Sequence, residues 1–407
     1  MPDERPMISW EQAVETVLSR TGLLGTEKIP LADARNRILA AAVRADVDSP
    51  PFDRSAMDGY AVRSADIGPA GADLEIIEKI AAGSLPTLPI GPGQTARIFT
   101  GAPIPEGADA VQIQERTEAG ESERKVRILE PVPPGENIRR QGEEVRAGQV
   151  VLEKGSPIGA AEIGMLAWTG NDQVPVARRP RVSILSTGDE LVEPGILPAG
   201  AQIRNSNGPM LTALAAAAGG NPDYLGIAGD EPGPLRALMA RGLSADLFLV
   251  SGGVSVGQRD RVRPFLEEMG VAIEFHGVAI RPGKPALFGR RGETLVFGLP
   301  GNPVSCLVIF RCLVAPAIRK LQGHRQPSPL LIPATLGRPV RRNRKRLLFL
   351  QARLEPGPGG LVAEPVSTTG SADLQSVVRS NAMILIPAGA DTLPAGAAVM
   401  VLPDESR

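Results

Sequence analysis

Short apolar runs alternate with glycine-bearing turns in the middle of the chain, and three of these pairs share one layout. The runs at residues 182–185, 247–250 and 295–297 lead directly into Ser186-Thr187-Gly188-Asp189-Glu190, Ser251-Gly252-Gly253 and Gly298-Leu299-Pro300-Gly301-Asn302. A short apolar run that ends in glycine is typical of a buried strand, and helical patterns follow the second and third turns. The layout predicts an open α/β sheet whose loops gather along one edge and present backbone N–H groups to an anion.

Two helices are predicted from the signals at their ends. Ser9 and Gln12 form a capping box at the start of a run of apolar residues at helical spacing, which predicts an amphipathic helix near the N-terminus. Residues 205–219 predict a second helix, with Asn207 as a possible cap, Pro209 near the first turn and a terminal Gly-Gly.

The other stretches contain many short apolar runs separated by Gly and Pro turns. Residues 61–130 predict a compact β-rich module, and strand-like runs return after a proline-rich boundary near residue 326. Residues 174–181, with two prolines among basic side chains, look like a linker. The α/β region therefore extends from about residue 180 to residue 321.

Composition and charge narrow the class of protein. A chain of 407 residues should hold roughly two to four domains. With 44 basic and 45 acidic residues, no global field favours nucleic acid or a membrane surface. Cys306 and Cys312 are expected to be free buried thiols in a reducing cytoplasm. The acidic first residues do not resemble a signal peptide, and no apolar run has membrane-spanning length.

A basic cluster at residues 338–346 invites a nucleic-acid interpretation. The cluster lacks interleaved aromatic residues, and the chain as a whole is neutral. We favour an exposed basic edge that either shields a strand or binds a small anionic ligand.

The turns after the three predicted strands carry the chemistry of an anion and metal site. Glycine allows the backbone to approach a phosphate, and the serine and threonine hydroxyls add donors. Asp189, Glu190, Asp230 and Asp260 follow the turns, and carboxylates beside a phosphate are the usual ligands of Mg²⁺. Lys284 can neutralise an oxyanion. Taken one at a time, Asp230 and Asp260 can equally cap helices, and Lys284 can simply be solvated. None of the loops has the GxxxxGK[ST] pattern, so the sequence does not support a Walker-type NTPase.

Candidates in the N-terminal half are ambiguous when each is taken alone. Asp58 lies in an Asp-Gly turn that a simple hairpin also explains. Thr100 lies in a rigid turn and either donates to an oxyanion or is only structural. Arg139 and Arg140 precede Glu143 and Glu144, which suits a solvated surface as well as a phosphate and metal site.

Taken together, the motifs resemble those of the MoeA family, the molybdopterin molybdenumtransferases related to the gephyrin E domain. They are SPPFDRSAMDGYAV, IFTGAPIPEGADAV, ENIRRQGEE, ILSTGDEL, SNGPML, LVSGGVSVG, IRPGKPALFG and GLPGNPVS, in the family's order and nearly its spacing. The resemblance covers essentially the whole chain. STGDEL and SGGVS alone are less specific, because MogA-like adenylyltransferases and CinA-like proteins share them.

The resemblance implies a multidomain fold and an elongated homodimer of four-part subunits. The expected domains are an elongated N-terminal domain (1–45 with 137–175), a β-rich inserted domain (46–136), a MogA-like α/β domain with an open, mostly parallel mixed sheet (176–325) and a small C-terminal β domain (326–407). The active site is expected in a cleft between the α/β domain of one subunit and parts of the other.

The implied reaction inserts molybdate into the dithiolene of adenylylated molybdopterin. Cleavage that depends on Mg²⁺ releases AMP and yields molybdenum cofactor. The metal would act on the pyrophosphate as a Lewis acid and charge shield, so no covalent nucleophile is needed. The resemblance further implies a MogA-like adenylyltransferase and molybdoenzymes or their chaperones as partners, and a cytoplasmic location is expected.

Site residues follow from the resemblance, position by position. The acidic residues expected to position metal and substrate are Asp58, Glu190, Asp230 and Asp260, with Glu144 as a further catalytic candidate. The expected substrate-binding residues are Thr100, Gly101, Arg139, Ser186, Thr187, Gly188, Asp189, Ser251, Gly252, Gly253, Arg281, Lys284, Pro300, Gly301, Asn302, Ser305 and Ser371.

Two positions depart from the family pattern. Glu144 stands where the family usually has aspartate, one methylene further out. The usual Arg-x-Glu-Phe-x-Arg pattern becomes Arg346-Leu347-Leu348-Phe349-Leu350-Gln351, which loses an acid and a base, whereas Gly370-Ser371 and Asn381 match. Two other functions remain open, a MogA-like adenylyltransferase and a non-catalytic scaffold. The long N-terminal half argues against the first, and the retained acidic residues argue against the second.

Overall fold

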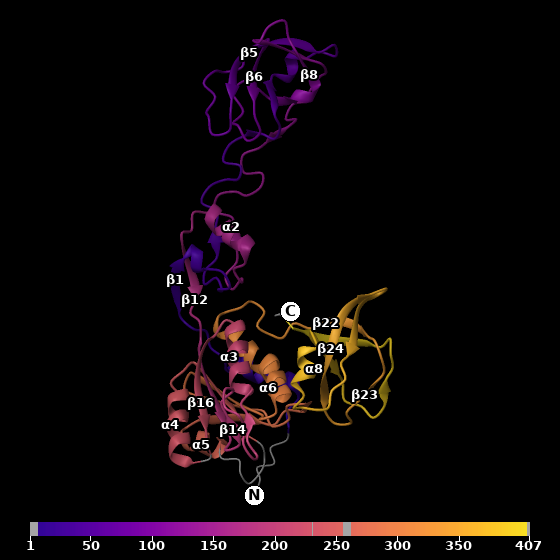
Figure 1. Cartoon of the computed structure of the whole chain (residues 1–407). Helices are drawn as coiled ribbons and strands as arrows, with labels where there is room; N and C mark the ends of the chain where they lie inside the picture. Colours follow the sequence, from indigo (N-terminus) through magenta and orange to yellow (C-terminus); the bar gives the residue numbers. More distant parts are fainter. Residues whose placement is uncertain (1–6, 230, 255–261, 405–407) are drawn as a thin grey trace. The chain divides into compact units, whose positions relative to one another are not determined.

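The computed structural model describes residues 7–229, 231–254 and 262–404 (Figure 1). It divides into two compact units. The first comprises Met1–Ala41, Lys154–Gly159 and Gln173–Arg407, and the second comprises Ala42–Glu153 and Ala160–Asp172.

A six-stranded sheet with the order β16-β13-β17-β21-β20-β18 forms the centre of the first unit. β16, β13, β17 and β21 are parallel, and β20 and β18 complete the sheet in antiparallel fashion. The expectation of an open, mostly parallel mixed sheet is confirmed. Its strands are β13 (Arg181–Thr187), β16 (Asn221–Ala228), β17 (Leu247–Ser251), β18 (Ala272–His276), β20 (Leu287–Arg291) and β21 (Thr294–Leu299), and two short strands, β14 (Leu191–Val192) and β15 (Ile203–Arg204), pair beside them.

Helices cover both faces of this sheet. Leu247 and Leu249 of β17 face a core shared with α1 (Trp10–Arg20), α3 (Asn207–Ala217), α6 (Pro303–Ile309), the π-helix η4 (Phe310–Val314) and α7 (Ala315–Leu321). Phe248 and Val250 face a second core with α4 (Pro232–Gly242) and α5 (Val262–Glu268). Because both faces of β17 are buried, its sequence is a continuous apolar run instead of an alternating one.

The N-terminal helix α1 begins as its sequence predicts. The Ser9 hydroxyl accepts the Gln12 N–H, and the Gln12 side chain accepts the Ser9 N–H, so the capping box is present. Trp10 packs edge-on against Phe349 of the C-terminal strands, with ring centroids 5.6 Å apart. The helix therefore connects the core of the α/β sheet with the C-terminal part of the chain.

The C-terminal strands form a sheet with the order β19-β24-β25-β22-β28-β26, which closes on itself because β24 also pairs with β26. β19 (Ile280–Arg281) comes from the α/β region and pairs in parallel with Leu347 and Leu348. The other elements are β22 (Ile332–Leu336), β24 (Leu347–Gly357), β25 (Gly360–Pro365), α8 (Leu374–Val378), β26 (Ala382–Ile386) and β28 (Ala398–Pro403), and β23 (Val340–Arg341) pairs with β27 (Thr392–Leu393).

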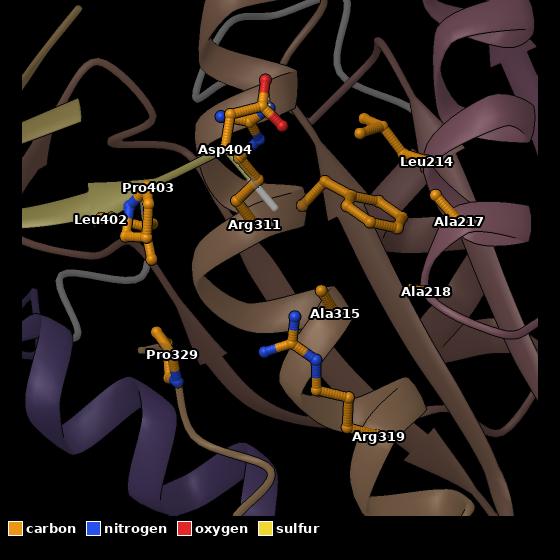
Figure 2. Close-up of a pocket in the computed structure, with 11 residues that line it drawn as sticks. Leu214, Ala217, Ala218, Arg311, Ala315, Arg319, Pro329, Leu402, Pro403 and Asp404 are labelled. Carbon is orange, nitrogen blue, oxygen red and sulfur yellow. Dashed lines mark ion pairs between the residues drawn. The ribbon is translucent and has the colours of Figure 1, made fainter. Parts of the chain in front are cut away.

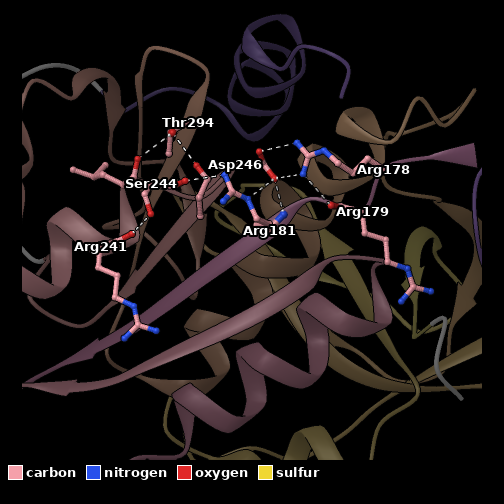
Figure 3. A network of polar contacts seen from close by, with 9 residues as sticks. Arg178, Arg179, Arg181, Arg241, Ser244, Asp246 and Thr294 are labelled. Carbon is pink, nitrogen blue, oxygen red and sulfur yellow. Dashed lines mark hydrogen bonds and ion pairs between the residues drawn. The ribbon is translucent and has the colours of Figure 1, made fainter. Parts of the chain in front are cut away.

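Asp246, just before β17, anchors the chain where it enters the central sheet. Its carboxylate accepts hydrogen bonds from both terminal nitrogens of Arg178 (2.9 and 3.0 Å) and from the Arg181 N–H (2.7 Å; Figure 3). Burial alone would raise the pKa of Asp246, but these hydrogen bonds outweigh it and hold the pKa below its usual value. The interpretation of residues 174–181 as a linker is wrong: β12 (Gln173–Ala177) pairs with β1 (Thr26–Pro30), and this network holds the residues that follow.

The second unit contains a six-stranded sheet with the order β7-β4-β6-β5-β9-β8, which fits the predicted β-rich module. Its strands are β4 (Gly59–Val62), β5 (Ala72–Ile80), β6 (Gln94–Ile98), β7 (Ala110–Ile113), β8 (Thr117–Ala119) and β9 (Lys125–Ile128). The unit also holds the pairs β2 (Val43–Arg44) with β11 (Val150–Leu152) and β3 (Arg54–Ser55) with β10 (Ile138–Arg139), and helix α2 (Ala160–Trp168).

Both cysteines are free and buried, as expected. None of the helices in the described residues is long and apolar enough to cross a membrane.

Candidate functional site

A cavity of about 770 Å³ lies at the carboxyl ends of β13, β17 and β21. It is in the place where ligands bind in open α/β sheets. Most of the residues expected from the three glycine turns line it: Thr187, Gly188, Asp189, Glu190, Ser251, Gly252, Gly253, Pro300, Gly301 and Asn302. Ser186 is not among the lining residues. It is fully buried and donates its hydroxyl hydrogen to Asn205 Oδ1 at 3.2 Å.

Gly252 shows why the sequence needs glycine in this loop. Its φ is +95°, and a Cβ atom there would lie 2.4 Å from the Thr187 carbonyl oxygen. Any side chain would therefore clash with the backbone of the neighbouring turn. The close approach also lets the Gly252 N–H reach Leu299 O at 3.0 Å, so the loops after β17 and β21 are joined.

Asn207 holds the same loops together from the first residue of α3. Its side-chain Nδ2 donates to Ser251 Oγ at 2.8 Å and to Gly301 O at 2.7 Å. The prediction that Asn207 caps the helix is wrong, since the N-cap is Ser206, whose side chain makes no capping bond, and the Gly208 N–H of the first turn donates to Asn205 Oδ1. Sequence reasoning missed this role because the two acceptors belong to other loops, far along the chain.

The carboxylates of Asp189 and Glu190 are exposed at the rim of this cavity. Hard oxygen ligands of this kind suit Mg²⁺, which combines one or two carboxylates with phosphate oxygens. Asp230 and Asp260, the other two acids expected beside the turns, lie outside the described residues. Within the described ranges, no group of three or more His, Cys, Asp or Glu residues gathers to hold a metal.

A second cavity of about 970 Å³ adjoins the first, because Pro285 lines both. Its lining is strongly cationic and includes Arg281 and Lys284, both expected from the sequence. Arg341, Arg342 and Arg346 add further positive charge, and no carboxylate is among the described residues that line it. The expected hydroxyl donors Ser305 and Ser371 also line this cavity.

Two contacts connect the walls of the two cavities. The Asn302 side chain donates to Ser371 Oγ at 2.8 Å, and the Val304 N–H donates to Ser371 O at 3.0 Å. Ser371 comes from the C-terminal part of the chain, whereas Asn302 and Val304 belong to the loop and helix after β21. Despite the lost motif, the C-terminal part therefore contributes to the site.

The basic loop at residues 341–346 is held in one shape. Asn343 Oδ1 accepts the N–H groups of Lys345 and Arg346 at 3.1 and 3.0 Å. Arg342 donates to Pro387 O and Ala388 O and pairs with Asp391. Residues of the loop line the cationic cavity and also, together with Ala390, a smaller hollow of about 360 Å³. Of our two interpretations, this placement supports binding of a small anion.

In the second unit, Asp58 and Thr100, two separate candidates from the sequence, lie together. Asp58 Oδ1 accepts the Thr100 N–H at 2.8 Å and the Thr100 hydroxyl at 2.7 Å. The backbone hydrogen bond, and then the hydroxyl, lower the pKa of Asp58. Gly101 has a φ of +84° and its N–H donates to Ser55 O at 2.8 Å. An ionised, exposed carboxylate is thus fixed in position.

Arg139 and Glu144 are also in the second unit but have partners of their own. Arg139 pairs with Glu143 at 3.0 Å. Glu144 accepts the Ser49 hydroxyl at 2.7 Å and contacts Arg54 at 3.3 Å. The longer side chain at position 144 is therefore engaged locally, whereas Asp58 is held by Thr100.

Another cavity, of about 270 Å³, lies between α3, the π-helix and the end of β28 (Figure 2). Leu214, Phe310, Ala315 and Leu402 give it a largely apolar wall. Arg311 pairs with Asp404 at 2.5 Å across one side. No residue expected from the motifs lines it.

Three family models match consecutive stretches of the chain. They are described as "MoeA N-terminal region (domain I and II)" over residues 8–170, "Probable molybdopterin binding domain" over residues 183–320, and "MoeA C-terminal region (domain IV)" over residues 333–403.

Full-length relatives and a solved structure agree with these matches. The molybdopterin molybdenumtransferase of Bacillus subtilis is 35% identical over 415 residues, covering 99% of this chain and 95% of the relative. That of Nostoc sp. is 38% identical over 393 residues, covering 93% and 88%. The crystal structure of the molybdopterin biosynthesis MoeA protein from Pyrococcus horikoshii OT3 has a TM-score of 0.84 at 30% identity and covers 97% of this chain and 99% of that one. This chain belongs to the MoeA family.

Proposed function

We propose that the protein is a molybdopterin molybdenumtransferase, which inserts molybdate into adenylylated molybdopterin and releases AMP. Its full-length relatives carry that name. The observation that carries the proposal in this chain is the pair of adjoining cavities: one is lined by glycine turns, hydroxyls and carboxylates, and the other by cations and hydroxyls.

The first cavity suits the pyrophosphate of the adenylylated substrate. Backbone N–H groups of the glycine turns can approach phosphate oxygens closely, and the Ser251 hydroxyl stands at the same edge. The Thr187 hydroxyl beside it donates to Ser251 O at 3.4 Å. The hydrogen bond from the Gly252 N–H to Leu299 O and the bonds from the Asn207 side chain to Ser251 and Gly301 keep these turns in fixed relative positions. Donors that are fixed before the substrate binds need no reorganisation when charge develops.

The second cavity suits molybdate, a tetrahedral dianion. Arg281 and Lys284 offer positive charge from one wall, Arg346 from the other, and Ser305 and Ser371 add hydroxyl donors. Charge-assisted hydrogen bonds of this type are stronger than neutral ones. The shared residue Pro285 means that the oxyanion would be held beside the substrate it has to join.

We also propose that Mg²⁺ assists the reaction. Glu190 and Asp189 at the cavity rim fit its preference for oxygen ligands, with Asp58, Asp230 and Asp260 as the other acids proposed for metal and substrate positioning. When bound, the ion would supply charge neutralisation at the pyrophosphate. The residues of this chain bind and orient the two substrates.

Two further properties of the proposal concern assembly and location. We propose a cytoplasmic homodimer in which parts of the partner subunit complete the site. Its partners would be a MogA-like adenylyltransferase that supplies the substrate and molybdoenzymes or their chaperones that take the product. Sedimentation equilibrium tests the dimer, and mixing two inactive variants with defects in different units tests whether subunits share a site.

The proposed function is tested by AMP release from adenylylated molybdopterin, with and without molybdate and Mg²⁺. We expect release only when both ions are present, and loss of release in Asp58→Asn. Asp73→Asn serves as a control, since Asp73 pairs with Arg127 on the same unit and belongs to no predicted site. Production of adenylylated molybdopterin from ATP would instead indicate an adenylyltransferase, and substrate binding without release would indicate a scaffold.

A further inference from the structure

We infer that Asn207 is a positioning residue that keeps the Ser251 hydroxyl free to donate its hydrogen to the substrate in the glycine-lined cavity. The inference rests on the proposed function and extends it. Asn207 and Ser251 both line that cavity, and both are buried, with exposed fractions of 7% and 2%. Nothing in the sequence motifs assigns this task to Asn207.

The orientation of the Asn207 amide is fixed by its second partner. A carbonyl oxygen such as Gly301 O can only accept, so the amide atom that faces it at 2.7 Å must be Nδ2. The same NH₂ group lies 2.8 Å from Ser251 Oγ. Exchanging the oxygen and nitrogen of the amide would place two acceptors against each other at Gly301. Asn207 therefore donates to Ser251.

The direction of the Ser251 hydroxyl follows from this. Its oxygen already accepts the Asn207 N–H, so its own hydrogen is available for donation. Cys306 Sγ lies 3.9 Å from this oxygen, in a contact in which either atom can be the donor. Burial raises the pKa of Cys306 to about 12, and a neutral thiol is a weak acceptor. The other direction open to the hydroxyl hydrogen is the cavity that Ser251 lines.

The neighbouring Asn205 accepts a hydrogen bond from a serine, whereas Asn207 donates one. Its Oδ1 accepts the Gly208 N–H at 3.1 Å, which fixes this amide too, and it also accepts the Ser186 hydroxyl at 3.2 Å. The hydrogen of Ser186 is thus used within the protein. Asn205 and Asn207 thus give two serines at adjacent strand ends different roles. Ser186 has a buried structural role, and Ser251 has a hydroxyl that faces the ligand.

Asn207 Oδ1 is buried and has no hydrogen-bond partner among the described residues. An unpaired buried amide oxygen is unfavourable. A residue chosen only for stability of the loop would not need this oxygen. The arrangement is understandable if the two donors of the NH₂ group, one to Gly301 and one to Ser251, are what the site requires.

The test reverses the hydrogen bond without changing the size of the side chain. In Asn207→Asp the new carboxyl group has at most one hydrogen to give, and Gly301 O, which only accepts, takes it. Ser251 must then donate to the new side chain and no longer to the substrate. We expect kcat/KM for AMP release to fall by about 10- to 100-fold, the effect of one hydrogen bond to a charged group, and Ser251→Ala to cause a similar loss.

The double variant decides between positioning and general support. If Asn207 acts through Ser251, Asn207→Asp combined with Ser251→Ala should be no worse than Ser251→Ala alone. Losses that multiply would overturn the inference. Asn205→Asp is the matched control, because its effect should multiply with that of Ser251→Ala. Asn207→Ala provides a second route through the same cycle if the aspartate variant does not fold.

Failure of the proposed function is distinguishable from failure of this inference. If the wild-type protein releases no AMP, the proposed function fails. The same set of single and double variants is then compared by calorimetry, which measures the dissociation constant of AMP in the presence of Mg²⁺. Non-additive losses of affinity would support the positioning role. Unchanged affinity in Asn207→Asp and Ser251→Ala, or no AMP binding to the wild-type protein, would overturn it.

Discussion

Thr100 donates two hydrogen bonds to a single oxygen of Asp58, one from its backbone N–H and one from its hydroxyl, at 2.8 and 2.7 Å. The pair holds the carboxylate in place and lowers its pKa. Because the pKa is lowered on folding, the contribution of Asp58 to stability is present above the pKa of the unfolded chain and is lost as the pH falls through the folded value.

The first prediction concerns Thr100→Val. Removing the hydroxyl donor should raise the pKa of Asp58 toward the ordinary aspartate value, because one of the two bonds that favour the charged form is gone. The acidic limb of the activity profile should move to higher pH, while activity near neutral pH changes less. Carbon NMR titration of the carboxyl group measures this. Thr87→Val is the control, since Thr87 makes the same pair of bonds to Glu78 and should leave Asp58 unaffected.

The second prediction concerns the basic loop. Replacing Arg344 and Lys345, which line only the outer hollow, with serine should raise KM for molybdate several-fold at low salt and leave kcat unchanged. These charges attract the anion without touching it in the larger cavity, and such steering weakens as ionic strength rises. Arg353→Ser removes an exposed arginine that pairs with Glu355 on β24 and should have no effect. A KM change that persists at high salt would contradict this explanation.

The third prediction concerns the inner cations. Lys284→Ala should weaken molybdate affinity by about 10- to 100-fold, the range expected for one lost charge-assisted contact, and Arg281→Ala should do the same. Equilibrium dialysis with molybdate measures the affinity directly. Arg291→Ala, at the end of β20 and outside both cavities, is the matched control. Equal affinity in all three variants would exclude this cavity as the oxyanion site.

The fourth prediction concerns Gly252. Gly252→Ala would place a Cβ atom 2.4 Å from Thr187 O at a φ of +95°. We expect a loss of about 1–3 kcal/mol of folding free energy or more from backbone strain, together with loss of activity. Gly233→Ala in α4 meets nothing within 4 Å, and should be neutral or stabilise by up to about 1 kcal/mol. Urea denaturation compares the two variants.

The fifth prediction concerns Asp246, whose pKa is held low by Arg178 and by the Arg181 N–H against the effect of burial. Asp246→Asn should cost about 1–2 kcal/mol near neutral pH, since a partly buried arginine loses its partner and half-exposed pairs are screened. The difference from wild type should vanish as the pH falls below the ordinary aspartate range, because the wild-type carboxylate then also becomes neutral. Asp223→Asn removes an exposed pair with Arg241 and should cost less.

Local patterns predicted the elements whose causes are local. The capping box at Ser9 and Gln12, the buried strands and the glycine turns all depend on residues that are adjacent in the chain. The cavity at the strand ends follows from these elements, because parallel strands bring their carboxyl ends to one edge. The motifs then placed Ser251, Gly252 and Glu190 on the same rim.

Contacts between distant segments could not be predicted in this way. The local pattern predicts a cap at Asn207, because its acceptors, Ser251 and Gly301, reach it only after three loops meet. Residues 174–181 resemble a linker in the sequence because β1, the strand that pairs with residues 173–177, lies near the N-terminus. The sequence allows two interpretations of the basic loop because its place beside Arg281 depends on the pairing of β19 with β24.

That pairing has a consequence for how the gene can recombine. β19 and the cationic turn after it are encoded with the α/β region. However, β19 pairs with β24 of the closed C-terminal sheet, here called the C-terminal barrel. A crossover at the apparent boundary near residue 326 would combine β19 from one parent with β24 from another and shift Arg281 and Lys284 relative to Arg346. Chimaeras between relatives should therefore keep activity only when residues 280–285 are inherited together with the C-terminal barrel.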